Sequence, residues 1–414
     1  MEASDRARPR AEALAPVEDV RALVLSSVAP LPPRQVPLAE AGGLVLAEPV
    51  VAPFDLPPFP NAAMDGFAVR SADTAPAPAA LRLVGEALAG RPFGGRVGPG
   101  EAVAVATGAV LPEGADAVVP LEEASVQGER VVVGQPVPPG RHVRGRGEDV
   151  RAGEVLLPAG TVLGPGQVAA AAATGREAVA VHPRPRAAVV PTGDEVVPAG
   201  RTPGPGQVHD AVSPALAVLV GEVGAVPLLR PVAPDDPGRL LDALEEAAAR
   251  SDVLVTVGGA SRGERDLVSR LEAGEAGRVV SFRVALRPAK PFAFGRAFGV
   301  PLFGLPGNPA SALAAFEELV RPALLAMMGR RPATRPSVRA FLAEDFEQRP
   351  GRLHLVRAEA WREGGRLLVR PAGRQGAGMV HSLARANAWM VVGPEVTSLP
   401  AGAEVEVRLL TDPP

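Results

Sequence analysis

The sequence predicts a multidomain protein that combines a parallel-sheet α/β domain with separate β domains. Three observations lead to this fold class. Residues 183–328 alternate strand-like and helical runs, which is typical of a parallel sheet with crossover helices. Residues 52–143 and 335–414 contain short valine-rich runs separated by Gly/Pro turns, which indicate small β modules. A chain of 414 residues is also long enough for two to four domains of roughly 100–200 residues each.

The order of these patterns along the chain predicts the domain boundaries. A helical pattern precedes the first valine-rich module, and a strand-like piece with an Ala-rich helix follows it. We therefore expect a discontinuous, helical N-terminal domain formed by residues 17–51 and 144–182, with a β domain of residues 52–143 inserted into it. The α/β domain is expected at residues 183–328 and a C-terminal β barrel at residues 335–414.

The composition excludes several classes of function. The chain has no cysteine, so disulfides, thiolate metal sites and cysteine nucleophiles are excluded. Its five histidines show no ligand spacing, which argues against a zinc site. A net charge of −3 without a long basic run argues against a nucleic-acid or polybasic membrane surface. The N-terminal residues lack a signal-peptide pattern and no apolar run reaches a membrane-spanning length, so we expect a cytoplasmic protein.

Lys290 is the only lysine, and the other 42 (43 − 1) basic residues among Lys and Arg are arginines. The chain also lacks tyrosine and isoleucine, which indicates a coding bias toward Ala, Gly, Pro, Arg and Val. A lysine that persists under such a bias either survives by chance or supplies a compact ammonium that the planar guanidinium cannot replace. The neighbouring motifs decide between these two interpretations.

Glycine-containing loops follow three predicted strands of the α/β domain. The carboxyl ends of parallel strands meet at one crevice, so these loops are expected to lie together. The loop at 306–311 could bind an anion through main-chain N–H groups, although the same residues also suit an ordinary strand-to-helix turn. In the loop at 258–266, glycines and Ser261 could cradle a phosphate and carboxylates could hold Mg²⁺, although Asp266 also suits a helix cap. The loop at 192–195 could face Lys290 with a carboxylate or form a solvated turn.

Eight segments of the chain resemble the molybdopterin molybdenumtransferase (MoeA-type) family, which includes the C-terminal domain of gephyrin. They occur in family order across almost the whole chain, so the resemblance is specific although each match by itself is weak. The segments are NAAMDGFAVR (61–70), VATGAVLPEGADAVVPLEE (105–123), RGEDVRAGEVLLPAGTVL (146–163), PTGDEVV (191–197), GGASRGERDLV (258–268), RPAKPFAFG (287–295), FGLPGNPASAL (303–313) and GMVHSLARANA (378–388).

The resemblance implies an enzyme of molybdenum cofactor synthesis. It implies that adenylylated molybdopterin reacts with molybdate, with Mg²⁺, to give the cofactor and AMP, and that residues 183–328 bind molybdopterin. It also implies a four-domain homodimer whose active cleft pairs the α/β domain of one subunit with the β domain of the other. A molybdopterin adenylyltransferase would be a partner, and neither nucleic acid nor a membrane is expected.

The resemblance also implies roles for individual residues. The implied catalytic residues are Asp65, Thr107, Asp149, Glu195, Asp266 and Lys290, and Glu195 and Asp266 are the implied ligands of Mg²⁺. The implied residues for binding the molybdopterin substrate are Thr192, Gly193, Asp194, Gly258, Gly259, Ser261, Gly263, Arg287, Pro306, Gly307, Asn308, Pro309, Ser311 and Ser382. Molybdate, pyrophosphate and dithiolene are all electron-rich, so a lysine, an arginine and glycine N–H groups suit them.

Three positions depart from the family pattern and keep an alternative open. Arg287 stands where a lysine is usual, Phe67 replaces a tyrosine, and Val212 replaces an asparagine, which removes one hydrogen bond to a ligand. The alternative is a weakened paralogue that carries molybdopterin or acts as a scaffold. A further hypothesis is the enzyme that adenylylates molybdopterin. That enzyme is a small single-domain protein, whereas this chain also matches the transferase family in its flanking domains. Molybdate and tungstate are nearly isosteric, so the sequence does not separate them.

Overall fold

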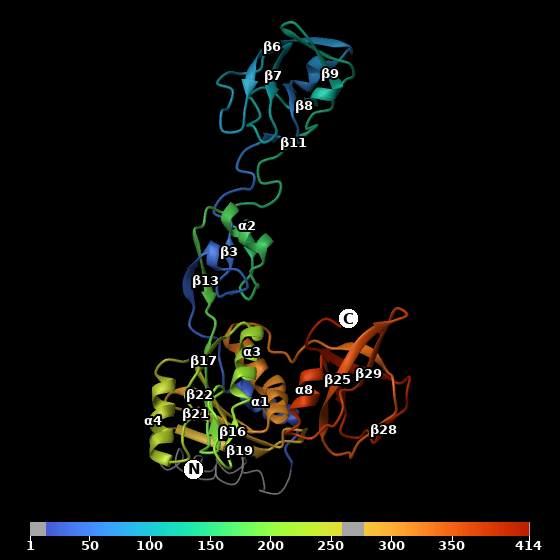
Figure 1. The fold of residues 1–414 in the computed structure, drawn as a ribbon. Helices are drawn as coiled ribbons and strands as arrows, with labels where there is room; N and C mark the ends of the chain where they lie inside the picture. The colour runs from blue at the N-terminus through green and yellow to red at the C-terminus, as the bar shows by residue number, and fades with distance from the viewer. Residues whose placement is uncertain (1–13, 259–276, 414) are drawn as a thin grey trace, which may run out of the picture. The chain divides into compact units, whose positions relative to one another are not determined.

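The computed structural model describes residues 14–258 and 277–413, which divide into two compact units (Figure 1). One unit contains the described parts of residues 1–34 and 181–414, and the other contains residues 35–180. In the described ranges, no helix is long and apolar enough to cross a membrane.

The unit of residues 35–180 is built on a six-stranded sheet of order β8-β5-β7-β6-β10-β9. The strands are β5 (Gly66–Val69), β6 (Ala79–Ala87), β7 (Glu101–Val105), β8 (Ala117–Pro120), β9 (Ala124–Gln127) and β10 (Arg130–Val133). Phe67 and Val69 point into one hydrophobic core and Ala68 into another, because successive side chains of a strand face opposite sides of the sheet. The small β module expected here from the sequence is confirmed.

Short pairings flank the six-stranded sheet. Segments before and after it pair with each other, β3 with β12 and β4 with β11, and β1, β13 and β2 form a third small sheet. This connectivity is that of an inserted module, although the four domain boundaries stay a prediction. The elements are β1 (Arg34–Pro37), β2 (Val45–Leu46), β3 (Val50–Val51), β4 (Asn61–Ala62), β11 (Val143–Arg144), β12 (Val155–Leu157), β13 (Ala178–His182), α2 (Pro165–Ala173), η1 (Leu38–Glu40), η2 (Ser71–Thr74) and η3 (Leu121–Glu123).

The second unit begins with an α/β part whose sheet has the order β17-β14-β18-β22-β21-β19. The first four strands in this order are parallel, as the alternating pattern predicted, whereas β21 is antiparallel to both its neighbours. The strands are β14 (Arg186–Pro191), β17 (Val226–Leu229), β18 (Val253–Val257), β19 (Gly277–Arg283), β21 (Pro291–Ala297) and β22 (Val300–Leu305). A small parallel pair joins β15 (Val196–Val197) to β16 (Val208–His209).

Helices cover both faces of this sheet (Figure 1). On one face, α4 packs over Ala188 and Val190 of β14, and on the other face α1, α3, α6 and α7 pack over Ala187 and Val189. Asp236 caps α4 by accepting a hydrogen bond from the Arg239 N–H, as expected for an acid before the first turn. The helices are α1 (Val17–Ser26), α3 (Ser213–Val223), α4 (Pro237–Ala248), α6 (Pro309–Ala315), the π-helical η4 (Phe316–Val320) and α7 (Arg321–Met327).

The C-terminal part is a closed β barrel. Five strands follow one another in the order β25-β26-β23-β29-β27, and pairing between β25 and β27 closes the ring. The barrel encloses its own core, in which Val356, Val369 and Met390 are buried. The β barrel expected from the sequence is confirmed. The elements are β20 (Leu286–Arg287), β23 (Val338–Leu342), β24 (Phe346–Glu347), β25 (Leu353–Glu363), β26 (Arg366–Pro371), α8 (Val380–Arg385), β27 (Ala388–Val392), β28 (Ser398–Leu399) and β29 (Glu404–Leu409).

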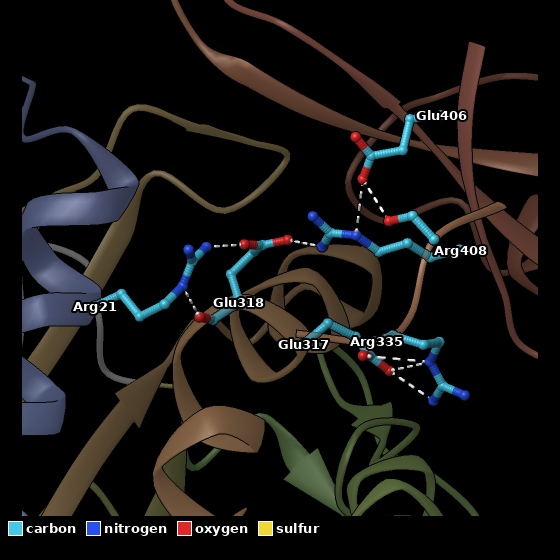
Figure 2. A network of polar contacts seen from close by, with 7 residues as sticks. Arg21, Glu317, Glu318, Arg335, Glu406 and Arg408 are labelled. Atoms are coloured by element: carbon cyan, nitrogen blue, oxygen red, sulfur yellow. Dashed lines mark hydrogen bonds and ion pairs between the residues drawn. The ribbon is translucent and has the colours of Figure 1, made fainter. Parts of the chain in front are cut away.

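A buried ionic network joins three elements of this unit (Figure 2). Glu318, on the π-helical turn, accepts hydrogen bonds from Arg21 of α1 and Arg408 of β29. Its neighbour Glu317 pairs with Arg335 at 2.8 Å. Residues 17–26 were grouped with the N-terminal domain from the sequence, and in the structure they form α1, which packs on η4 and α7.

Candidate functional site

A cavity of about 670 Å³ lies at the carboxyl ends of the parallel strands β14, β18 and β22. Thr192 and Glu195 reach it after β14, Gly258 after β18, and the loop 306–309 after β22. These are the three strand ends at which the sequence predicted ligand-binding loops. The expected crevice therefore exists in the described residues. Its lining includes the predicted residues Pro306, Gly307, Asn308 and Pro309.

Close backbone contacts fix the shape of this crevice. Gly258 has φ +92°, and a Cβ there would lie 2.7 Å from the carbonyl oxygen of Thr192, a distance that no side chain tolerates. The loop after β22 contacts the same glycine: a Cβ at Gly307 would lie 3.5 Å from the Cα of Gly258. Glycine at 258 therefore allows the loops after β14 and β18 to approach each other closely. Gly193, also in the first loop, has φ +125°.

The segment that carries Lys290 is attached to the same edge of the sheet. The Val284 N–H donates to the Lys290 carbonyl at 2.7 Å, and Ser311 Oγ of α6 donates to the Pro288 carbonyl at 3.0 Å. Lys290 is half-buried, and the next residue, Pro291, lines the cavity. The Lys290 ammonium forms no ion pair with a carboxylate of residues 14–258 or 277–413. The segment next to the crevice thus carries a cation that no carboxylate of the described ranges neutralises.

Asp210 and Val212, which directly precede α3, also line the cavity. Asp210 Oδ1 accepts hydrogen bonds from the N–H groups of Val212 (3.1 Å) and Ser213 (2.9 Å). Val212 is only 4% exposed and belongs to the hydrophobic core of the sheet. The apolar side chain is therefore accommodated by packing. Asp210 was not a predicted site residue, and its position three residues before Ser213, where a Ser-Pro helix start occurs, could have indicated a cap.

The last wall comes from the barrel side of the unit. Gly378 and Val380 line the cavity, and the Ala310 N–H of α6 donates to the Ala377 carbonyl at 3.2 Å. Ser382 is 2% exposed, and its Oγ accepts a hydrogen bond from Arg357 Nε at 2.8 Å. Ser382 is thus a buried anchor of this segment.

Arg357 is a residue that sequence reasoning missed. It is 1% exposed and also donates to the carbonyls of Arg374 (3.1 Å) and Gly376 (3.0 Å), which holds the loop before α8 in place. Burial lowers the pKa of the Arg357 guanidinium. The available signal was an arginine within the mainly apolar strand-like run at 353–358.

Some predicted residues lie elsewhere. Asp194 exchanges backbone-to-carboxylate hydrogen bonds with Asp235, at 3.3 and 3.2 Å, and does not line the crevice. Arg287 lines a separate cavity next to the barrel. The predicted residues Gly259, Ser261, Gly263 and Asp266 lie outside the described residues.

Two of the predicted residues in the other unit, Asp65 and Thr107, contact each other. Asp65 Oδ1 accepts hydrogen bonds from the Thr107 N–H (2.6 Å) and from Thr107 Oγ1 (2.8 Å). These bonds, that to the backbone N–H first, lower the pKa of Asp65 below its ordinary value, because they stabilise the ionised carboxylate. Asp149 is exposed, and its N–H donates to the Leu56 carbonyl at 3.0 Å. The structure therefore presents Asp65 as an exposed, ionised and oriented carboxylate.

Comparisons with known proteins match the chain along almost its whole length. Three family models match in order: the MoeA N-terminal region (domain I and II) at residues 15–175, the "probable molybdopterin binding domain" at 188–326, and the MoeA C-terminal region (domain IV) at 339–410.

Curated relatives and solved structures agree with these models. Molybdopterin molybdenumtransferase 2 of Mycobacterium tuberculosis is 35% identical, over 92% of this chain and 95% of its own length. Molybdopterin molybdenumtransferase 1 of the same organism is 37% identical, over 95% and 98%. The crystal structure of a molybdopterin biosynthesis MoeA protein from Pyrococcus horikoshii superposes with a TM-score of 0.82 at 33% identity and covers 97% of this chain and 100% of that one. The chain therefore belongs to the MoeA family of molybdopterin molybdenumtransferases.

Proposed function

We propose that this protein is a molybdopterin molybdenumtransferase, which takes adenylylated molybdopterin and molybdate and releases AMP as the molybdenum cofactor forms. The observation that carries the proposal is the crevice, in which the loops after β14, β18 and β22 converge within the segment that matches the molybdopterin-binding family model. Ligands of open α/β sheets bind at this edge. The names of the full-length relatives support the same reaction.

The residues of the crevice suit two anionic substrates. Molybdate and a pyrophosphate group repel each other, so a site that joins them must offset negative charge. Lys290 supplies a cation that is not paired in the described chain, and Gly258 and Gly307 let main-chain groups approach the ligand closely. Cleavage of a phosphoanhydride needs mainly positioning and electrostatic stabilisation. The absence of cysteine is therefore no obstacle to this chemistry.

We also propose that Mg²⁺ takes part. Glu195 and Asp210 both line the crevice, and carboxylate oxygens are the ligands that Mg²⁺ prefers. One carboxylate oxygen of Asp210 accepts hydrogen bonds from the N–H groups of Val212 and Ser213 at the start of α3. The other oxygen is left for a ligand. Glu195, Asp210 and the predicted ligand Asp266 would hold the ion, which when bound supplies Lewis-acid stabilisation of the pyrophosphate charge.

We further propose a homodimer in which Asp65, Thr107 and Asp149 of one subunit complete the crevice of the other. The support is that the Asp65 carboxylate is ionised and exposed, and that two hydrogen bonds from Thr107 hold it in one orientation. A molybdopterin adenylyltransferase is the proposed partner, since it would supply the adenylylated substrate.

The direct test is release of AMP from adenylylated molybdopterin by the purified protein with Mg²⁺, with and without molybdate. Release that depends on molybdate is the expected result, and sulfate serves as the matched tetrahedral anion that should not replace molybdate. Tight substrate binding without molybdate-dependent release would contradict the proposal and support the carrier alternative. A parallel assay with tungstate would measure the preference between the two metals.

A further inference from the structure

A second cavity, of about 850 Å³, lies where β20 meets the barrel, and its wall is basic. Arg287 comes from β20, and Arg349 and Arg352 come from the loop between β24 and β25. Pairing of β20 with β25 places Arg287 opposite His354, which also lines the cavity. Glu347 contributes one carboxylate to the wall, so positive charge is in excess.

The three arginines are not neutralised within the described chain. None of them forms an ion pair with a carboxylate of residues 14–258 or 277–413. Burial lowers the pKa of the Arg287 guanidinium, and the positive charges of Arg352 and Arg349 lower it further. Like charges that face one cavity repel each other, and a bound anion removes this cost while it gains charge-assisted hydrogen bonds.

His354 adds a second recognition element. Its Nδ1 lies 2.8 Å from Gln348 Oε1. The amide nitrogen of Gln348 already donates to the carbonyls of Gly393 (3.0 Å) and Val396 (2.9 Å). Gln348 Oε1 is therefore the acceptor, and Nδ1 of His354 carries the proton, which leaves Nε2 as an acceptor.

The imidazole also stays neutral. His354 is 5% exposed, and burial followed by the charge of Arg287 lowers its pKa to about 3. His354 thus adds a neutral hydrogen-bond acceptor to a lining that is rich in guanidinium donors. A fully deprotonated oxyanion satisfies only the arginines, whereas an oxyanion that retains a proton can satisfy both.

We propose that this basic cavity is a binding site for a protonated phosphate group, either free hydrogen phosphate or the terminal phosphate of a larger ligand. The phosphate oxygens accept hydrogen bonds from Arg287, Arg349 and Arg352, and the P–OH donates to His354. This site is separate from the crevice at the carboxyl ends of the parallel strands, and its occupancy does not depend on the transferase reaction.

Calorimetric titration of the full chain near pH 6, where phosphate monoanion and dianion coexist, tests the proposal. Inorganic phosphate should bind saturably and at least about tenfold more tightly than sulfate, which offers no proton. The double variant Arg349→Gln/Arg352→Gln should weaken phosphate binding by at least about tenfold. Arg339→Gln is the matched control, since Arg339 is an exposed arginine of β23 in the same barrel and does not line the cavity.

Several outcomes would overturn the inference. Absence of saturable phosphate binding, or binding that the double variant leaves unchanged, would remove the site. Equal affinity for sulfate would remove the role of His354. Glycerol 3-phosphate distinguishes the two sources: tighter binding than inorganic phosphate indicates a larger phosphorylated ligand, and weaker binding indicates free phosphate, provided that both depend on Arg349 and Arg352. Since binding is the readout, an inactive transferase would not affect the result.

Discussion

The ammonium of Lys290 lies on a half-buried segment beside the crevice, and its removal leaves no described carboxylate without an ion-pair partner. Lys290→Ala should therefore change the free energy of unfolding by less than about 0.5 kcal/mol. The same substitution should reduce molybdate-dependent AMP release about 100-fold, because a cation that stabilises developing negative charge is lost. Rate measurement and denaturant unfolding on the same preparation check both parts.

Lys290→Arg is the informative control for this prediction. It keeps the charge but replaces a compact ammonium with a planar fork, so an intermediate rate is expected if the geometry of the cation matters. A normal rate for Lys290→Ala would exclude Lys290 from the mechanism, whatever the arginine variant does.

Asp65 provides a prediction on pH. Its pKa in the folded protein is lowered by two hydrogen bonds from Thr107, so this contribution to stability is present above the unfolded pKa and is lost as the pH falls through the lower folded pKa. Thr107→Val removes the hydroxyl but keeps the backbone N–H, and should therefore raise the pKa of Asp65 only part of the way to its ordinary value. Carboxyl NMR titration measures this shift.

Thr107→Ser keeps a hydroxyl and is the control for that titration. It should preserve the low pKa of Asp65. If Thr107→Val and the unchanged protein titrate at the same pH, the side-chain hydrogen bond does not stabilise the carboxylate, and the backbone N–H accounts for the whole effect.

At the residue scale, the sequence predicted which loops line the crevice better than it predicted the contacts of individual side chains. Thr192, Glu195 and Asn308 were expected in one crevice and line it, because loops after parallel strands must meet at one edge. Arg287 was expected there too, but it lines another cavity, since the β20–β25 pairing that directs it toward the barrel is a long-range contact with no local signal. Arg357 was missed because its partners, Ser382 and the carbonyls of Arg374 and Gly376, are also distant in sequence.

The π-helical turn η4 is an element whose role depends on buried charge (Figure 2). Its Glu318 is fully buried between Arg21 of α1 and Arg408 of β29. Glu318→Gln removes the carboxylate that Arg21 and Arg408 share in a largely buried site, and Arg408 keeps only its 3.6 Å contact with Glu406. This loss should lower the free energy of unfolding by about 3 kcal/mol. Urea denaturation, followed by tryptophan fluorescence of the barrel, measures the loss.

Glu222→Gln is the matched control for the buried network. Glu222 also pairs with an arginine, Arg335, but its side chain is 41% exposed. Water screens such a pair, so its loss should cost less than about 1 kcal/mol. Equal effects of the two substitutions would mean that the Glu318 network does not join α1 and the barrel energetically.

Elements with a clear periodic pattern were the ones that the sequence predicted. The helix expected after the loop at 306–311 exists, and it begins at Pro309. Its π-helical turn was not expected, because that turn accommodates Glu317 and Glu318 against arginines distant in sequence. Strand β21 was also not expected: its sequence PFAFGRA lacks branched residues, and pairing with β19 and β22 defines it.

At the scale of the whole molecule, the eight ordered segments predicted the family and the types of fold, because each segment is local. The contacts between two subunits, in contrast, do not follow from local sequence motifs. Asp65 and Thr107 contact each other within residues 35–180, whereas Glu195 and Pro306 line a crevice in the other unit. The two halves of the proposed site therefore lie in different units, and an experiment on assembled subunits tests whether they form one cleft.

Complementation between inactive subunits provides that experiment. Asp65→Asn and Lys290→Ala subunits, each nearly inactive, are mixed in equal amounts after dissociation. If each cleft takes Asp65 from one subunit and Lys290 from the other, half of the dimers are mixed and one of their two clefts is intact, so activity should recover to about a quarter of the unmutated value. The matched control mixes Glu195→Gln with Lys290→Ala, because both residues belong to the same unit and no mixed dimer then has an intact cleft. Recovery in the control as well would indicate residual activity of the variants, and no recovery in a proven mixed dimer would place Asp65 and Lys290 in the cleft of a single subunit.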